Sequence, residues 1–166
     1  VRPRSRFDQK RLTIELEHGN IAPLPATMDS QAEGLVYGTT VPQLLKQLDR
    51  ITQDLGVAKL DNFIYKDTRG YRLLLQEAEA EGNAVLASAM RAEIATLDAQ
   101  PRWHDPTVAL QTIHSLKEFL ATNSHTLPGK DPQATAQWTL WDLEAYDRIL
   151  TDLERQGLKF AFVERN

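Results

Sequence analysis

The chain has 166 residues, of which 42% are hydrophobic and 25% are charged, and its formal net charge at pH 7 is −4. This composition is typical of a globular protein with a hydrophobic core and excludes a chain that is disordered throughout. Because the sequence contains no cysteine, disulfides, thiolate nucleophiles and metal sites built on cysteine are excluded. No apolar stretch approaches the roughly 20 residues that a membrane helix needs. We therefore expect a cytoplasmic protein for which a membrane is not a partner.

Residues 1–11 form a basic segment at the start of the chain. They contain one acidic residue, Asp8, and five basic residues, Arg2, Arg4, Arg6, Lys10 and Arg11. This local charge of +4 leaves the rest of the chain near −8. We interpret the segment as a solvated arm that need not be ordered. The alternative is an arm that contacts phosphate groups or a partner, although the acidic charge of the whole chain argues against nucleic acid as a ligand.

Three short segments in the first half of the chain are predicted to be strands. Apolar and polar residues alternate over 12–18, which places Glu15 and Glu17 on the face that points to solvent. A second strand is expected at 34–38, an apolar segment bounded by glycines, and a third at 60–65.

A helix is predicted from about residue 41 to Leu55. Thr40 and Gln43 fit a capping box at its start, and Gly56 is a natural stop. Its apolar residues recur at helical spacing and are Val41, Leu44, Leu45, Leu48, Ile51 and Leu55.

Residues 71–99 are rich in good helix formers. Gly82 and Asn83 interrupt this segment, so either two helices, about 71–81 and 84–98, or one bent helix is expected. The second part carries an apolar stripe formed by Leu86, Met90, Ile94 and Leu97.

A further helix begins at the dipeptide Asp105-Pro106. The Asp105 carboxylate can accept hydrogen bonds from free N–H groups of the first turn, and Pro106 suits the first helical position. The apolar residues of this helix share one broad face and are Ala109, Leu110, Ile113, Leu116, Phe119 and Leu120.

A loop of about 16 residues is expected at 122–137. The last helix then begins near Thr139 and ends at Gly157, and a fourth strand follows at 158–163. Together these elements predict a single α+β domain over residues 12–166. In it, four or five helices pack against a small, mostly antiparallel or mixed sheet of about four strands.

The candidate binding residues are aromatic and lie near two helix starts. Trp103 and His104 come directly before Asp105, and Trp138 and Trp141 flank the start of the last helix. If the two helix starts meet, these four side chains frame a concave aromatic surface that suits a ligand or partner. The alternative is that they fill the core and pack against helix starts.

The sequence favours a protein that is not an enzyme. No two histidines have H-x-x-x-H spacing, and the motifs H-E-x-x-H, G-x-S-x-G and G-x-G-x-x-G are missing. We therefore assign no catalytic residue, no cofactor and no metal. The alternative is a small enzyme that uses His104, beside Asp105, or His114 with acidic neighbours.

These observations favour a soluble bacterial-type domain that binds another protein. The acidic body after residue 11 suggests an inhibitor of a basic partner, such as an immunity or antitoxin-like protein. Weak nucleic-acid binding through the basic arm is the remaining alternative.

Overall fold

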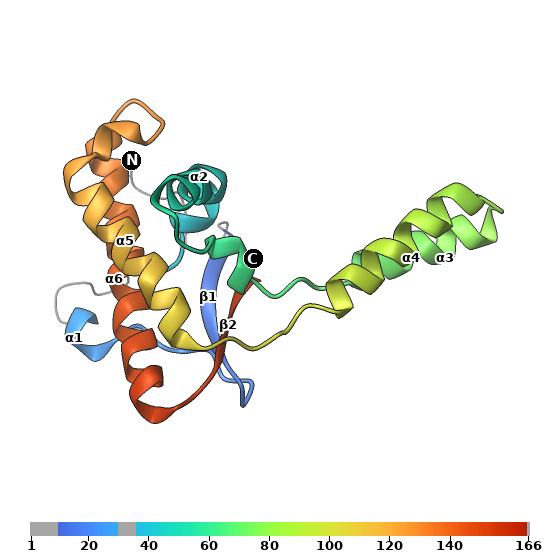
Figure 1. The fold of residues 1–166 in the computed structure, drawn as a ribbon, viewed down its shortest axis with the longest axis horizontal. Coiled ribbons are helices and arrows are strands. Elements are labelled where there is room, and N and C mark those ends of the chain that lie inside the picture. The colour runs from blue at the N-terminus through green and yellow to red at the C-terminus, as the bar shows by residue number, and fades with distance from the viewer. Residues whose placement is uncertain (1–9, 30–35, 166) are drawn as a thin grey trace. The chain divides into compact units, whose positions relative to one another are not determined.

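The structure is a computed structural model that describes residues 10–29 and 36–165 (Figure 1). These residues group into two compact units. Unit 1 consists of the described residues up to Ile64 and from Trp103 onward, and unit 2 is the inserted segment Tyr65–Arg102. A single domain over residues 12–166 stays a prediction. Of the predicted basic arm, residues 1–9 lie outside the described residues, whereas Lys10 pairs with Glu164 at 2.9 Å.

Unit 1 contains a two-stranded antiparallel sheet. β1 (Arg11–Leu16) pairs with β2 (Phe160–Arg165), and Ile14 lies opposite Phe162. The predictions of strands near 12–18 and 158–163 are confirmed with small shifts of their bounds.

The prediction of a sheet of about four strands is wrong. Of the segment predicted at 34–38, the described residues 36–38 form no strand, because Gly38 takes a φ of +85° that interrupts extended backbone. The segment predicted at 60–65 begins as a 3-10 helix, Leu60–Phe63. Leu60 and Phe63 are both buried, and a separation of three places them on one side of a helical turn but on opposite faces of a strand.

Both faces of β1 are covered. Glu15, which we predicted to face solvent, is buried, and its carboxylate lies 3.4 Å from the guanidinium of Arg165. The simple alternation of buried and exposed residues therefore fails in this strand. Of the two glutamates, Glu17 is exposed, and it lies in the turn after the strand.

The free edge of β2 is extended by two single bridges. Ile64 bridges Phe162, and His104 bridges Phe160. The chain leaves unit 1 after Ile64 and returns to it at Trp103. The residues at which the chain leaves and re-enters unit 1 therefore lie beside the same strand, next to positions two residues apart.

The helices of the first half of unit 1 are short. They are α1 (Ala26–Asp29), the 3-10 helix Val41–Leu44 and α2 (Leu45–Leu55), which ends at Gly56 as predicted. The predicted capping box is not formed. The Thr40 side chain makes no cap hydrogen bond, and the Gln43 amide donates to the Thr39 carbonyl at 2.7 Å.

Two long helices form the body of unit 1. α5 (Pro106–Thr122) and α6 (Pro132–Gln156) pack side by side, joined through the 3-10 helix Ser124–Thr126 (Figure 1). The Asp105 cap is confirmed, since its carboxylate accepts from Thr107 N–H at 2.9 Å.

The last helix begins seven residues before the predicted start at Thr139. Asp131 accepts a hydrogen bond from Ala134 N–H at 3.1 Å, and Pro132 occupies the first helical position. The start of α6 therefore repeats the Asp-Pro signal of α5, so the predicted loop over 122–137 is too long.

The hydrophobic core lies where α5, α6 and α2 meet the sheet. Tyr146 of α6 is fully buried, and its hydroxyl donates to the Leu12 carbonyl of β1 at 2.6 Å. Its ring lies 5.0 Å from that of Phe162. Every member of the main hydrophobic cluster found among the described residues belongs to unit 1.

Unit 2 is a hairpin of two helices, α3 (Arg69–Ala80) and α4 (Ala84–Asp98). Of the two possibilities that the sequence left open, two helices are confirmed. Gly82 adopts a φ of +70° in the turn, and the Asn83 side chain caps α4 by accepting from Leu86 N–H at 3.1 Å. No helix in the described part of the chain combines the length and apolar character needed to cross a membrane.

We expect Asp131→Ala to lower the free energy of unfolding by about 0.5–2 kcal/mol, because it removes the only side chain that caps α6. Urea denaturation followed by circular dichroism measures this change. Asp54→Ala is a suitable control, since Asp54 is exposed near the end of α2 and its loss should cost less than about 0.5 kcal/mol. Equal losses in the two variants would contradict the capping role.

Candidate functional site

Trp103 and His104 lie where the chain enters α5. His104 exchanges two backbone hydrogen bonds with Phe160, at 2.8 and 3.1 Å. Its ring packs edge-on against Phe63, with 5.4 Å between centroids, and partial burial lowers the pKa of the imidazole. Asp105 uses its carboxylate to cap α5, so the structure explains His104 by packing rather than by an acid–base pair with Asp105.

Trp138 and Trp141 lie in the first half of α6, and both are half-buried. The Trp141 indole donates to the Val36 carbonyl at 3.3 Å and packs against the hydrophobic core. The hydrogen bond and the packing against the core therefore account for the position of Trp141.

The structure does not bring the four predicted aromatic residues together. α5 and α6 run antiparallel, because Thr107 at the start of α5 donates to Glu154 near the end of α6 at 2.8 Å. Trp138 lies 16 residues before Glu154, which is about 24 Å along a helix. The two helix starts, whose meeting would have framed an aromatic surface, thus lie at opposite ends of the helix pair, and binding by these residues stays a prediction.

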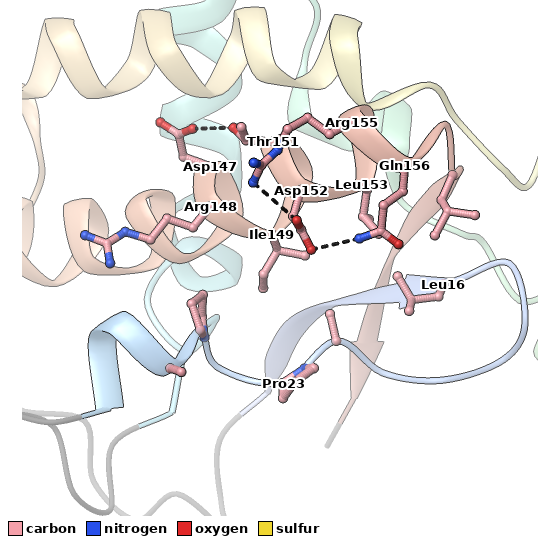
Figure 2. Close-up of a pocket in the computed structure, with 14 residues that line it drawn as sticks. Leu16, Pro23, Asp147, Arg148, Ile149, Thr151, Asp152, Leu153, Arg155 and Gln156 are labelled. Carbon is pink, nitrogen blue, oxygen red and sulfur yellow. Dashed lines mark hydrogen bonds and ion pairs between the residues drawn. The ribbon is translucent and has the colours of Figure 1, made fainter.

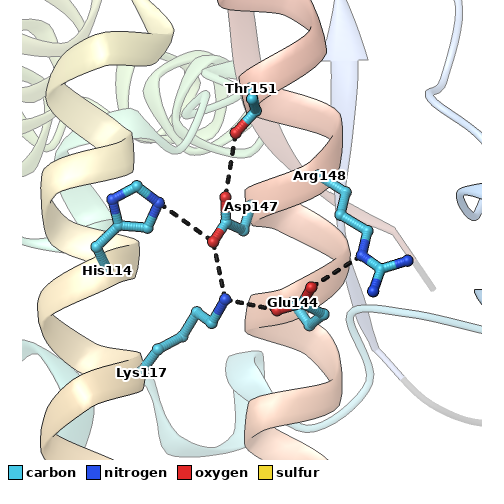
Figure 3. A network of polar contacts seen from close by, with 6 residues as sticks. All are labelled: His114, Lys117, Glu144, Asp147, Arg148 and Thr151. Carbon is cyan, nitrogen blue, oxygen red and sulfur yellow. Dashed lines mark hydrogen bonds and ion pairs between the residues drawn. The ribbon is translucent and has the colours of Figure 1, made fainter.

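A network of polar side chains connects α5 to α6 (Figure 3). The Lys117 ammonium contacts the Glu144 carboxylate and lies 2.8 Å from that of Asp147. Asp147 also accepts from Thr151 at 3.1 Å and lies 3.2 Å from His114 Nε2. This arrangement joins the two helices on the side away from the core.

The protonation of this network suits a structural role. Partial burial alone would lower the pKa of Lys117, but hydrogen bonds to Asp147 and Glu144 raise it above its ordinary value. Partial burial would raise the pKa of Asp147, and hydrogen bonds from Lys117 and His114 lower it instead. A nucleophilic lysine needs the opposite shift, a lowered pKa that frees its amine.

A groove of about 780 Å³ lies between the loop that follows β1 and α6 (Figure 2). Its apolar lining includes Leu16, Ala22, Pro23, Pro25, Ile149, Leu153 and Leu158. Asp152, at the rim, accepts from Arg155 at 3.3 Å and Gln156 at 2.9 Å. Neither His104 nor His114 lines this groove. Its charged side chains form ion pairs, Asp152 with Arg155 inside the groove, and Asp147 and Arg148 with Lys117 and Glu144 outside it.

Asp142 is the most deeply buried acid among the described residues. Its carboxylate accepts three backbone N–H groups, from Gly38 at 2.7 Å, Thr40 at 2.9 Å and Val41 at 3.0 Å. Burial raises the pKa of Asp142 to about 6, although these three hydrogen bonds lower it. Asp142 caps the turn that the Thr40 side chain was predicted to cap, and this explains its burial without a catalytic role.

The hairpin of unit 2 has a narrow core. Its inward residues recur at alternating spacings of three and four, as the a and d positions of an antiparallel coiled coil do. The buried members are Ala78, Ala87 and Ile94, and the half-buried members are Tyr71, Leu75, Met90 and Leu97. Of the apolar stripe predicted for α4, Met90, Ile94 and Leu97 face the core. Leu86 does not, and the neighbouring Ala87 is buried in its place.

Two ion pairs close one flank of this core. Arg72 pairs with Asp98 at 2.8 Å, and Glu79 pairs with Arg91 at 2.8 Å. All four residues occupy heptad position e, so position e of both helices lies on this side. We call it the ion-paired flank.

The opposite flank carries heptad position g of both helices, and we call it the leucine flank. It presents Leu74 from α3, Glu81 directly after the end of α3, and Leu86 and Glu93 from α4. Leu74 is 44% exposed and Leu86 is 37% exposed. Within the described part of the chain, Glu81 and Glu93 form no ion pair.

Sequence reasoning missed the leucine flank, although a signal was present. Leu73, Leu74 and Leu75 are consecutive, and three neighbouring positions of a helix cannot all face one narrow core. At least one leucine of the run must therefore be exposed or covered by something else.

Among the described residues, no group of three or more His, Asp or Glu side chains is placed to hold a metal ion. Comparisons with known protein families, with curated proteins and with solved structures find no match to this chain.

Proposed function

We propose that this protein is a binding module for another protein and that the helical hairpin of unit 2 is its binding element. The observation that carries the proposal is the exposure of four large aliphatic side chains on 38 residues. Leu73 is 61% exposed and Val85 is 83% exposed, in addition to Leu74 and Leu86 of the leucine flank. Exposure of several large aliphatic side chains on so small a unit is typical of interaction surfaces.

The energetics of the hairpin favour a covered state. Helices of 12 and 15 residues are at the length where isolated helices are marginal in water. The hairpin core fully buries two alanines and one isoleucine, whereas each large aliphatic side chain contributes roughly 1.5–3 kcal/mol when fully buried. A partner that covers Leu74 and Leu86 would therefore stabilise the hairpin while binding to it.

The refinement to an acidic inhibitor of a basic partner, of the immunity or antitoxin type, draws support from the glutamates of the leucine flank. The enzyme alternative has less support, since the His104 ring lies against Phe63 and His114 is tied to the Asp147 network. Nucleic-acid binding through the arm stays a prediction, because residues 1–9 lie outside the described residues.

Site-specific crosslinking in cells of the native host tests the proposal. A photoreactive residue replaces Ala89, which is exposed beside the leucine flank at heptad position c, in the full chain. We expect one protein to be captured in high yield and identified by mass spectrometry, with the adduct lost in the background of Leu74→Ser and Leu86→Ser.

The neighbouring residue Ser88 provides the control. It is also exposed but lies at position b, beside the ion-paired flank. If Ser88 captures the same proteins as Ala89, the labelling does not depend on the leucine flank, and if neither captures a protein, the hairpin has no partner. Either result contradicts the proposal.

A further inference from the structure

The charges of the hairpin are divided unequally between its two sides. Each of its arginines is engaged elsewhere: Arg69 pairs with Asp67 at 2.7 Å, Arg72 and Arg91 close the ion-paired flank, and Arg102 stacks on the Tyr65 ring. The leucine flank holds Glu81 and Glu93, and Glu77 lies beside it at heptad position c. Its exposed leucines are thus surrounded by uncompensated negative charge.

The two leucines of this flank lie at different heights along the hairpin. Counted from Gly82, Glu81 and Leu86 fall within the first turn or so on either side, whereas Leu74 and Glu93 lie two to three turns away. Near the turn the glutamate follows the end of α3 and the leucine lies in α4, whereas farther from the turn the leucine lies in α3 and the glutamate in α4. Each leucine therefore lies across the hairpin seam from a glutamate.

This pattern argues against a second copy of the chain as the occupant. Two leucine flanks can face each other about a two-fold axis with their hairpins parallel or antiparallel. In either arrangement the position opposite a leucine is a glutamate of the other copy. Self-association would bury carboxylates against aliphatic side chains without partners for them, which is unfavourable.

We propose that the leucine flank docks a single basic amphipathic helix of another protein, which completes a three-helix bundle with α3 and α4. This inference rests on the proposed function and specifies its partner. The apolar stripe of the incoming helix would cover Leu74 and Leu86, in the manner of an amphipathic helix laid into a groove between two helices. Lysines or arginines beside that stripe would pair with Glu81 and Glu93 at the rim.

Two synthetic peptides serve as probes for the full-length protein. The basic peptide is a 21-residue helix with a leucine stripe flanked by lysines, and the acidic peptide is identical except that glutamates replace the lysines. Fluorescence anisotropy should show that the protein binds the basic peptide at least tenfold more tightly at low salt. This preference should decrease with rising ionic strength, as screening requires.

Two pairs of substitutions that change the net charge equally distinguish a local effect of the glutamates on binding from an effect of the overall charge. We expect Glu81→Gln with Glu93→Gln to weaken binding of the basic peptide about tenfold, since each rim ion pair contributes modestly. The control combines Gln76→Lys with Ser88→Lys, which changes the net charge by the same +2 at exposed b positions and should alter the affinity less than twofold. Leu74→Ser with Leu86→Ser should weaken binding of both peptides.

Three results would overturn the proposal. They are equal affinity for the two peptides, equal losses in the two charge variants, and a dimer in sedimentation that Leu74→Ser with Leu86→Ser dissociates. If crosslinking from Ala89 still captures a protein when the peptides show no preference, the hairpin binds a partner of different chemistry and only the basic helix is excluded. If Ala89 captures nothing, the proposed function itself fails.

Discussion

Gly38→Ala is expected to lower the free energy of unfolding by about 2–5 kcal/mol, a large share of the stability of an ordinary domain. A Cβ at this position would lie 2.1 Å from the Leu12 carbonyl oxygen, and φ is +85°. The left-handed backbone costs an L-residue about 1–2 kcal/mol. Because the obstacle is backbone, β1 or the segment of Gly38 must shift, at a further cost of about 1–3 kcal/mol.

The shift would also disturb two hydrogen bonds that fix this segment. Leu12 N–H donates to the Gly38 carbonyl at 2.7 Å, and Gly38 N–H donates to Asp142 at 2.7 Å. Gly56→Ala is the matched control, because Gly56 has a φ of +73° but nothing within 4 Å of an added Cβ. It should cost only about 1–2 kcal/mol in the same denaturation experiment. Equal losses of stability in the two variants would show that the backbone can move Gly38 away from the Leu12 carbonyl at little cost.

Asp142→Ala is expected to cost at least about 3 kcal/mol at pH 4, because it leaves three N–H donors without their acceptor. Asp142→Asn should fall between the wild type and the alanine variant. Its amide oxygen can still accept from one or two of the donors, whereas its NH₂ group faces another donor.

The pH dependence of this cost follows from the raised pKa of Asp142. The pKa is about 6 in the folded protein against 3.8 for the ordinary carboxyl group, so the folded state favours the protonated form. The contribution of Asp142 to stability is fully present below pH 3.8 and is lost as the pH rises through 6. A pKa raised from 3.8 to about 6 corresponds to a change of about 3 kcal/mol in the free energy of unfolding.

The stability gap between wild type and Asp142→Ala should therefore narrow between pH 4 and pH 7, as urea denaturation at several pH values can measure. A gap that stays constant would show that the pKa is not shifted in the folded protein. A gap that widens would show that the three hydrogen bonds outweigh burial and lower the pKa.

Local signals predicted the helices of this fold well. The left-handed glycine after Leu55, the Asp105 cap and the break at Gly82 depend on neighbouring residues alone, and all three are confirmed. The start of α6 at Asp131-Pro132 carries the same signal as α5 and could have been recognised.

The sheet was predicted poorly because short apolar segments take their conformation from distant partners. Leu60–Phe63 forms a 3-10 helix whose first N–H is held by the Asp49 carboxylate at 2.8 Å, from the preceding helix α2. The turn after Gly38 is capped by Asp142, more than 100 residues away in sequence. No nearby residue indicates either contact.

In the candidate site, too, features set by neighbouring residues could be predicted from the sequence, whereas features set by the packing of distant segments could not. The positions of Trp103 and Trp141 at opposite ends of the helix pair depend on the antiparallel packing of α5 and α6, which the aromatic pattern does not encode. The leucine flank, in contrast, follows from heptad spacing within one hairpin once the break at Gly82 is recognised.

The hairpin is inserted between Ile64 and Trp103, so its surface can change in sequence independently of the core of unit 1. Its ends join unit 1 at adjacent bridges on β2, and the main hydrophobic cluster of the described residues draws no member from it. Substitutions at Leu74, Leu86 or the glutamates beside them leave that cluster intact. Substitutions on the surface of the proposed binding element can therefore change what it recognises while the core of unit 1 stays constant.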